Sequence, residues 1–276
     1  MHKNYRLMAV DMDGTLLDSQ KRILPETLED ISWAVSAGKE IALCTGRGVR
    51  EIDEYLEELK EIRYTVLLSG AHVYDQKEKK TVFFRGIGFE EAEKVLDVCD
   101  RYDGMIQLMT EQASYVRGDQ ISHMKEYHME AYQPMFERVM IRMEDVRKTL
   151  AEIDPPGKML IYFRTVEDRQ KGLEELKELP LELIYQEETS IEITAAGIDK
   201  GTGLRVLADH INIPISQVIA VGDSGNDRTM LAAAGFPIAV ANASEEIKMM
   251  AQAVTGDNDH NGVGEAIRAY MKEAES

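Results

Sequence analysis

Two short apolar runs near opposite ends of the chain each stop abruptly at a cluster of acidic and small polar residues. The run at residues 6–10 leads into Asp11-Met12-Asp13-Gly14-Thr15, and the run at residues 217–221 leads into Gly222-Asp223-Ser224-Gly225-Asn226-Asp227. An apolar run that ends in this way is typical of a buried parallel strand feeding a loop. In an open α/β sheet, ligands bind beyond the carboxyl ends of the strands. If both strands lie in one sheet, we expect at least four carboxylates at one edge.

A cluster of carboxylates repels itself unless a cation lies within it. Hard divalent cations prefer oxygen ligands, and Mg²⁺ in proteins usually binds one or two carboxylates and keeps several waters. The sequence therefore predicts a Mg²⁺ site in which Asp11 and Asp223 are the direct ligands.

Strand and helix patterns alternate in the early and late parts of the chain, which is typical of βαβ units on a parallel sheet. Pro25 near the start and Gly38 just past the end frame a predicted helix at residues 25–37. The other elements expected here are strands at 40–44, 64–68, 71–74, 190–194 and 237–240, and helices at 49–60, 200–211, 226–234 and 262–271.

The middle of the chain has a different pattern, with short strand candidates between helical stretches. We expect strands at 81–84, 105–109, 113–116, 158–163 and 181–185, helices at 90–103, 145–153 and 167–178, and a loop-rich connection at 117–138. The predicted organisation is a Rossmann-like α/β core built from residues 1–83 and 189–276, with an α+β unit inserted at residues 84–188.

The composition limits the partners of such a protein. The chain has 276 residues, with 32 basic against 50 acidic side chains and a formal net charge of -18. Nucleic acid and anionic membranes are therefore unfavourable partners, because both attract basic surfaces. Two cysteines make no disulfide framework, the first six residues do not resemble a secretory signal, and no apolar run approaches about 20 residues. We expect a cytoplasmic protein, as a monomer or weak homodimer.

Each polar motif has an ordinary structural explanation when taken alone. Asp-x-Asp after a strand is often an Asx turn, acidic residues favour helix N-termini, and Lys200 at a helix start would usually be a solvated side chain. The serine-protease-like Gly222-Asp223-Ser224-Gly225 is rejected because strands and helices alternate along the chain. The ordered occurrence of all the motifs, each at a strand end or helix start, favours a functional site.

The full set of motifs resembles motifs one to four of the haloacid dehalogenase-like (HAD) phosphatases. The matching residues are Asp11-x-Asp13-Gly14-Thr15-Leu16, then Thr45-Gly46-Arg47, then Lys200, then Gly222-Asp223-x-x-Asn226-Asp227. The insertion resembles the C2 cap of the Cof-type subgroup. Two positions depart from the pattern: Ser69 stands where the subgroup usually has Asn, and Arg228 where an apolar residue is commoner.

The resemblance implies catalytic roles for the two aspartates of the first motif. Asp11 would attack phosphorus and form an aspartyl-phosphate, which divides hydrolysis into two easier steps. Asp13 would protonate the leaving alkoxide and then deprotonate the attacking water, and its backbone carbonyl would be a further metal ligand. The implied metal site is therefore Mg²⁺ held by Asp11, Asp13 and Asp223.

The resemblance also implies which groups would bind the phosphoryl oxygens. These are the Thr45 hydroxyl, the Lys200 ammonium and backbone N–H groups such as those of Met12 and Gly46. Asn226 would contact the phosphate or orient Asp11. Asp227 would hold Mg²⁺ through water or orient Lys200. Arg47 would reach the phosphate or only cap its own loop.

The expected activity is hydrolysis of small phosphorylated metabolites, for which sugar phosphates, flavin mononucleotide or riboflavin precursors, and pyridoxal phosphate all suit the family. Two alternatives remain open: a phosphomutase that uses the same aspartyl-phosphate, and a phosphometabolite-binding protein without turnover. The cap would exclude water and supply specificity. Its candidate specificity residues are Arg117, His123, Lys125 and His128.

Overall fold

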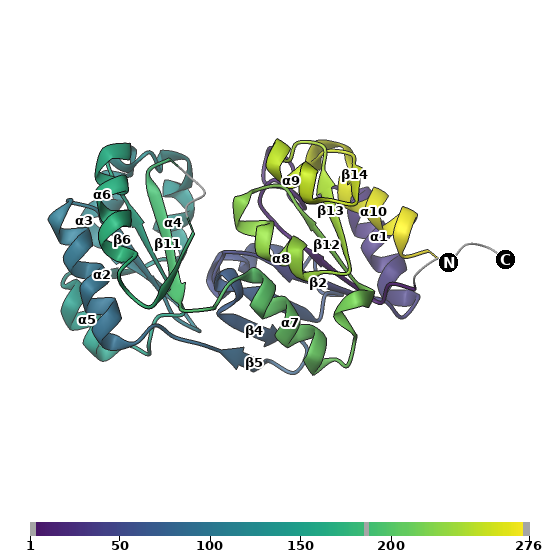
Figure 1. Cartoon of the computed structure of the whole chain (residues 1–276), viewed down its shortest axis with the longest axis horizontal. Helices are drawn as coiled ribbons and strands as arrows, with labels where there is room; N and C mark the ends of the chain where they lie inside the picture. The colour runs from purple at the N-terminus through teal and green to yellow at the C-terminus, as the bar shows by residue number, and fades with distance from the viewer. Residues whose placement is uncertain (1–3, 185–187, 273–276) are drawn as a thin grey trace. The chain divides into compact units, whose positions relative to one another are not determined.

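The computed structural model describes residues 4–184 and 188–272, which form two compact units (Figure 1). The first unit contains the chain up to Gly46, Tyr55–Phe83 and the chain from Asp199 onward. The second unit contains Arg47–Glu54 and Phe84–Ile198. The chain thus enters the second unit twice, first in a short segment directly after Gly46.

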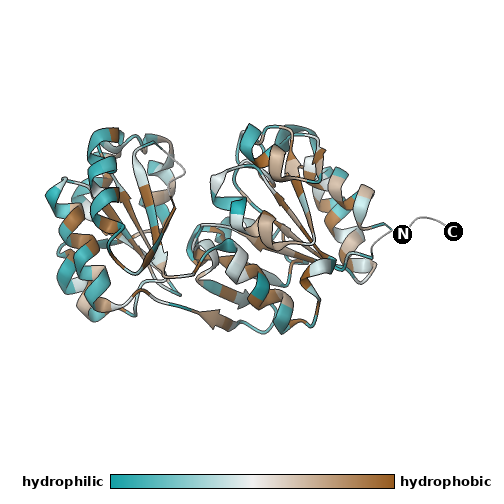
Figure 2. Cartoon of the chain, viewed as in Figure 1, coloured by the Kyte–Doolittle hydropathy of each residue, from teal (hydrophilic) through white to brown (hydrophobic). Residues whose placement is uncertain are grey.

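An eight-stranded sheet forms the centre of the first unit. In spatial order its strands are β14 (Ala253–Thr255), β13 (Phe236–Val240), β12 (Val218–Gly222), β1 (Leu7–Val10), β2 (Glu40–Cys44), β3 (Tyr64–Leu67), β4 (His72–Asp75) and β5 (Lys80–Phe84). Neighbouring strands are parallel from β14 to β3, and β4 is antiparallel to β3. Every residue of β1 and β12 is buried. Figure 2, coloured by hydropathy, draws the central strands of this unit largely in brown, the hydrophobic end of the scale. The predicted parallel α/β sheet is confirmed.

Helices flank this sheet. They are α1 (Pro25–Ser36), α7 (Lys200–His210), α8 (Arg228–Ala233), α9 (Glu245–Met250) and α10 (Gly262–Tyr270), with α1 against α10 and α7 against α8. In α1 the residues Thr27, Ile31 and Ala34 are buried. Their spacing puts them on one helix face, so this face is the one that packs inward.

The second unit is built on a six-stranded sheet. Its strands, in spatial order, are β10 (Leu181–Ile184), β11 (Ser190–Ala195), β9 (Lys158–Tyr162), β6 (Met105–Met109), β7 (Ser114–Arg117) and β8 (Ile141–Met143). Its helices are α2 (Phe89–Arg101), α3 (Gly118–Ile121), α4 (Gln133–Val139), α5 (Val146–Glu152) and α6 (Val166–Leu176). Tyr185, the predicted last residue of the β10 strand, lies outside the described residues.

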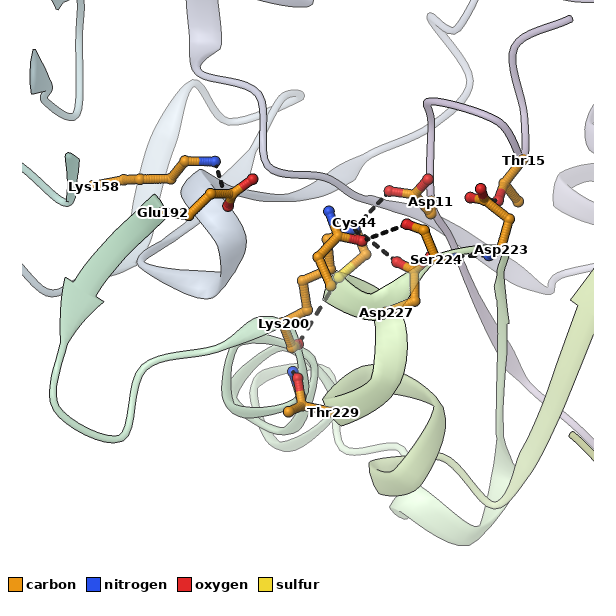
Figure 3. Close-up of polar contacts among 12 residues, drawn as sticks. Asp11, Thr15, Cys44, Lys158, Glu192, Lys200, Asp223, Ser224, Asp227 and Thr229 are labelled. Atoms are coloured by element: carbon orange, nitrogen blue, oxygen red, sulfur yellow. Dashed lines mark hydrogen bonds and ion pairs between the residues drawn. The ribbon is translucent and has the colours of Figure 1, made fainter. Parts of the chain in front are cut away.

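One face of this second sheet carries a buried polar network. The Lys158 ammonium lies 2.7 Å from a carboxylate oxygen of Glu192, across from β9 to β11 (Figure 3). Gln107 accepts a hydrogen bond from the Tyr162 hydroxyl at 2.9 Å and donates one to the Glu51 carboxylate at 3.0 Å. Glu51 therefore anchors the Arg47–Glu54 segment to the centre of the second sheet.

The predicted helix at residues 49–60 is wrong. The structure has two single-turn 3₁₀ helices, Val49–Glu51 and Asp53–Tyr55, followed by turns. Glu51 is buried and accepts hydrogen bonds from the Ser114 hydroxyl and from the Gly48 N–H. These tertiary contacts override the local helical pattern.

Two further expectations differ from the structure. Residues 190–194 were assigned to the core, whereas β11 pairs antiparallel with both β9 and β10 and so belongs to the second sheet. The second unit therefore extends past the expected boundary at 188 to Ile198. The predicted loop-rich stretch 117–138 contains α3, two 3₁₀ turns and most of α4. Buried Ile121, Met124 and Phe136 give α3, the first 3₁₀ turn and α4 an inward side.

None of the helices in the described part of the chain combines the length and the apolar composition that a bilayer crossing requires.

Candidate active site

The two acidic motifs meet at one edge of the first sheet, because β1 and β12 are neighbours and run parallel. Val10 is paired with Val221, and the Asp11 N–H donates to the Val221 carbonyl at 3.0 Å. Asp11 and Asp223 therefore follow adjacent strand ends, which is the juxtaposition the sequence predicts.

Lys200, the first residue of α7, brings these motifs together (Figure 3). Its ammonium donates to Asp11 Oδ1 at 2.6 Å and to Asp227 Oδ1 at 2.7 Å, and it lies 3.3 Å from Asn226 Oδ1. The side chain of Lys200 has no exposed surface, and those of Asp11 and Asp227 are nearly or fully buried. A buried ammonium among carboxylates is stable only when it is paired in this way.

Asp227 organises the loop after β12. Its Oδ2 accepts the backbone N–H groups of Asp223 at 2.9 Å and Ser224 at 3.1 Å, while its Oδ1 binds Lys200. A Cβ on Gly222 would lie 2.6 Å from the Asp227 carboxyl carbon, so only glycine leaves room for this carboxylate. Both oxygens of Asp227 are thus engaged in holding the loop and the lysine.

Two side chains that the sequence motifs contain, but that we did not assign to the site, contribute to it. The Thr15 hydroxyl donates to Asp223 Oδ1 at 2.8 Å, and the Ser224 hydroxyl donates to Asn226 Oδ1 at 3.0 Å. Gly14 has φ of +83°, and a Cβ there would lie 2.7 Å from Asp223 Oδ2. The sequence feature that could have predicted a place in the site for Thr15 and Ser224 is a hydroxyl group within an acidic loop.

A strained turn positions the start of α7 and therefore Lys200. Leu68, Ser69 and Gly70 all have positive φ, and a Cβ on Gly70 would lie 1.9 Å from the Asp199 carbonyl oxygen. The Asp199 side chain caps α7 by accepting the Thr202 N–H at 2.7 Å. Ser69, at the position where the Cof-type subgroup that the sequence resembles usually has Asn, adopts a left-handed conformation that Asn tolerates well.

The same turn reaches the predicted phosphate-binding motif after β2. The Ser69 N–H donates to the Thr45 carbonyl at 3.1 Å, and the Thr45 N–H donates to the Val66 carbonyl at 2.8 Å. Thr45 is buried beside this turn, in the first unit together with Gly46. Met12 has a buried side chain, and its carbonyl accepts N–H groups of the turn that follows.

Two predicted site residues have other contacts. The Asp13 carboxylate pairs with Lys21, whose Nζ lies 2.7 Å from Asp13 Oδ1. Arg47 belongs to the second unit, where its guanidinium donates to the Glu51 carbonyl at 3.1 Å. Among the cap candidates, Arg117 forms an ion pair with Asp119, His123 Nδ1 lies 3.0 Å from Glu126 Oε1, and His128 contacts the Arg164 carbonyl.

The electrostatics of the cluster favour binding of a cation. Burial first, and then the charge of Asp227, raise the pKa of Asp11 well above its ordinary value. Burial likewise raises the pKa of Asp223 to about 6, helped by Asp227. Burial alone would lower the pKa of Lys200. The carboxylates of Asp11 and Asp227 raise this pKa instead, which keeps the ammonium charged.

The carboxylates of Asp11, Asp223 and Asp227 each have an oxygen within 4.8 Å of the others, so three acids face one ammonium. An additional cation would relieve the repulsion that, beside burial, raises the pKa values of Asp11 and Asp223. Because both oxygens of Asp227 already accept hydrogen bonds, Asp11 and Asp223 are the better placed ligands. The donor set is entirely oxygen, which fits a hard divalent cation.

Comparisons with known proteins identify the class. The sequence profile of the haloacid dehalogenase-like hydrolases matches residues 8–267. This span includes nearly all of both units, and the chain therefore belongs to that family of hydrolases, as its motifs suggested.

Particular relatives align along nearly the whole chain. Phosphatase YwpJ of Bacillus subtilis (strain 168) is 27% identical over 287 residues, covering 96% of this chain and 100% of that protein. The 5-amino-6-(5-phospho-D-ribitylamino)uracil phosphatase YitU of the same organism is 26% identical over 272 residues, covering 96% and 97%. A solved haloacid dehalogenase-like hydrolase from B. subtilis has 27% identity and a TM-score of 0.83, covering 96% of this chain and 99% of that one.

Proposed function

We propose that this protein is a Mg²⁺-dependent phosphatase that hydrolyses small phosphomonoesters through an aspartyl-phosphate on Asp11. The observation that carries the proposal is the contact of 2.6 Å between the buried Lys200 ammonium and Asp11 Oδ1, at the edge where Asp223 also lies. The names of the aligned relatives, which are phosphatases, support the same reaction class.

In the first step an Asp11 carboxylate oxygen attacks phosphorus, and the bond from phosphorus to the ester oxygen breaks. Asp13, two residues further along the same loop, gives its proton to the departing oxygen, so an alcohol leaves rather than an alkoxide. Lys200 holds the Asp11 carboxylate in one orientation and offsets part of the repulsion between two anions.

In the second step Asp13 takes a proton from water as that water attacks phosphorus. The acyl phosphate bond breaks, inorganic phosphate is released and the Asp11 carboxylate is restored. Thr45, Lys200, Asn226 and the N–H groups of Met12 and Gly46 would donate to the phosphoryl oxygens. Asp11, Asp223 and the Asp13 carbonyl would hold Mg²⁺, which when bound supplies positive charge opposite the phosphoryl group.

Asp227 has a supporting role, because it binds Lys200 and the backbone of the loop that follows β12. Arg47 is proposed to support the phosphate-binding loop that precedes it. The substrate is proposed to be a small phosphorylated metabolite, and the phospho-ribityl substrate in the name of YitU is one example of this chemistry.

The test is release of inorganic phosphate from a panel of phosphorylated metabolites, with Mg²⁺ and with EDTA. Asp11→Asn is compared with Asp209→Asn, the same chemical change at an exposed position on α7. We expect Mg²⁺-dependent release by wild type and Asp209→Asn, and a loss of at least about 1,000-fold in Asp11→Asn. Isomerised sugar phosphate without phosphate release would indicate a mutase, and binding without turnover a binding protein.

A further inference from the structure

A tight turn at Asp18–Arg22 follows the first motif. The buried Asp18 carboxylate accepts the backbone N–H groups of Gln20 and Arg22, both at 2.8 Å, and also the Arg22 guanidinium. The Lys21 N–H donates to the Asp18 carbonyl at 2.9 Å. Asp18 thus accepts the backbone N–H groups of Lys21 and of the residues before and after it, which fixes the backbone at Lys21.

Lys21 has φ of +61°, a left-handed conformation that residues other than Gly, Asn and Asp seldom adopt. The turn itself would be less strained with one of those residues. A second contact maintains the conformation, because the hydroxyl of buried Tyr55 donates to the Lys21 carbonyl at 3.1 Å. Strain that surrounding contacts maintain in this way often marks a functional position.

The result of this arrangement is that the Lys21 ammonium lies 2.7 Å from Asp13 Oδ1. The two side chains are 48% and 34% exposed, so solvent screens the pair and its contribution to folding stability is small. The contact also bears on the geometry of Asp13, because an ammonium 2.7 Å from one carboxylate oxygen favours the orientations of the carboxyl group that keep this contact.

We propose that Lys21 is a positioning residue that orients the Asp13 carboxyl group for proton transfer to the leaving group and from the attacking water. This inference rests on the proposed function, in which Asp13 is the acid and base. Proton transfer requires the carboxyl oxygen to lie within hydrogen-bond distance of the reacting oxygen. A carboxyl group that rotates freely would meet this requirement in only part of its orientations.

The experiment compares Lys21→Asn, Lys21→Arg and Asp13→Asn, and combines the first and last in a double variant. Lys21→Asn removes the ammonium, while Asn suits the left-handed backbone, so its Tm should equal or exceed that of wild type. Phenyl phosphate and p-nitrophenyl phosphate serve as probes, because they have nearly the same shape but phenolate is the more basic leaving group. The readout is the single-turnover rate of phenol or nitrophenol release.

We expect Lys21→Asn to slow release from phenyl phosphate by about 10-fold or more and release from p-nitrophenyl phosphate by less than about 3-fold. Lys21→Arg should restore much of the lost rate with phenyl phosphate. In the Asp13→Asn background, Lys21→Asn should have no further effect, because residues that act through one another are not additive.

Equal losses with both esters, no loss with either, or a full additional loss in the Asp13→Asn background would overturn the inference. These outcomes differ from failure of the proposed function, which would appear as wild-type turnover in Asp11→Asn. A Lys21→Asn variant like wild type beside an inactive Asp11→Asn would therefore reject Lys21 alone.

Discussion

The Lys200 ammonium lies 2.6 Å from Asp11 Oδ1, in a position with no exposed surface on the lysine. The two residues lie 189 positions apart in the chain, and Asp227 accepts from the same ammonium at 2.7 Å. This buried lysine both balances the charge of the acids and fixes the orientation of the carboxylate that we propose as nucleophile.

Replacement of this lysine should separate stability from activity. Lys200→Met leaves two buried carboxylates without their cation, and we expect it to lower the free energy of unfolding by about 3–5 kcal/mol. Adding Asp227→Asn should recover part of that stability but none of the activity. Urea unfolding and phosphate release measure the two effects. Wild-type stability of Lys200→Met would contradict the buried pair.

Divalent cation binding should be visible without any substrate. Because a ligand that binds only the folded state stabilises it, Mg²⁺ should raise the Tm of the wild-type protein treated first with EDTA. Asp223→Asn should greatly reduce this shift, while the exposed control Asp209→Asn should retain it. Thermal unfolding at matched ionic strength measures the shift, and an unchanged shift in Asp223→Asn would remove this residue from the metal site.

Substitution of Gly70 should be far more damaging than substitution of Gly38, although both glycines have positive φ. Gly70 and Gly38 have φ of +100° and +75°, but a Cβ on Gly70 would meet the Asp199 carbonyl at 1.9 Å, whereas Gly38 has nothing within 4 Å. We expect Gly38→Ala to cost about 1 kcal/mol with normal kcat. Gly70→Ala should cost about 1–3 kcal/mol more and lower kcat, because it displaces the start of α7. Similar effects of the two substitutions would show that the turn does not position Lys200.

Glu51 should make stability depend on pH. Burial raises the pKa of this carboxyl above its ordinary value of 4.5, against smaller opposing effects of Ser114 and Lys158. The Glu51 carboxyl therefore binds a proton more tightly in the folded state than in the unfolded state. As pH rises from the ordinary pKa of this carboxyl through its raised pKa, the free energy of unfolding falls. Glu51→Gln removes the titration, so its stability relative to wild type should increase from acidic to neutral pH. Urea unfolding across pH checks the slope, and a difference that does not change with pH would argue against a raised pKa of Glu51.

Much of the first unit follows from sequence because the signals are local. The apolar run at β1 and the one at β2, each ending at polar residues, predict the strand ends that carry Asp11 and Thr45. Parallel neighbours then bring Asp11 and Asp223 to one edge. The sequence pattern could not show which strands share a sheet, and so β11 was placed in the wrong one.

The remaining differences come from contacts between distant residues. Nothing near Glu51 in the sequence indicates that Gln107 and Ser114 contact its carboxylate, so the local pattern predicted a helix at 49–60 where the structure has 3₁₀ turns. The pairing of Lys21 with Asp13 depends on a left-handed backbone that a lysine gives no local reason to expect. Such contacts form only when the complete fold brings the residues together.

The most direct test of the account is to locate the covalent intermediate. The Asp13→Asn variant, which should form the aspartyl-phosphate from p-nitrophenyl phosphate but hydrolyse it slowly, is mixed with this ester and Mg²⁺, quenched in acid and digested for mass spectrometry. We predict a phosphoryl group on the peptide that contains Asp11, lost when Asp11 is changed to Asn. Turnover with the phosphoryl group on another residue, or with none on the protein, would contradict the account.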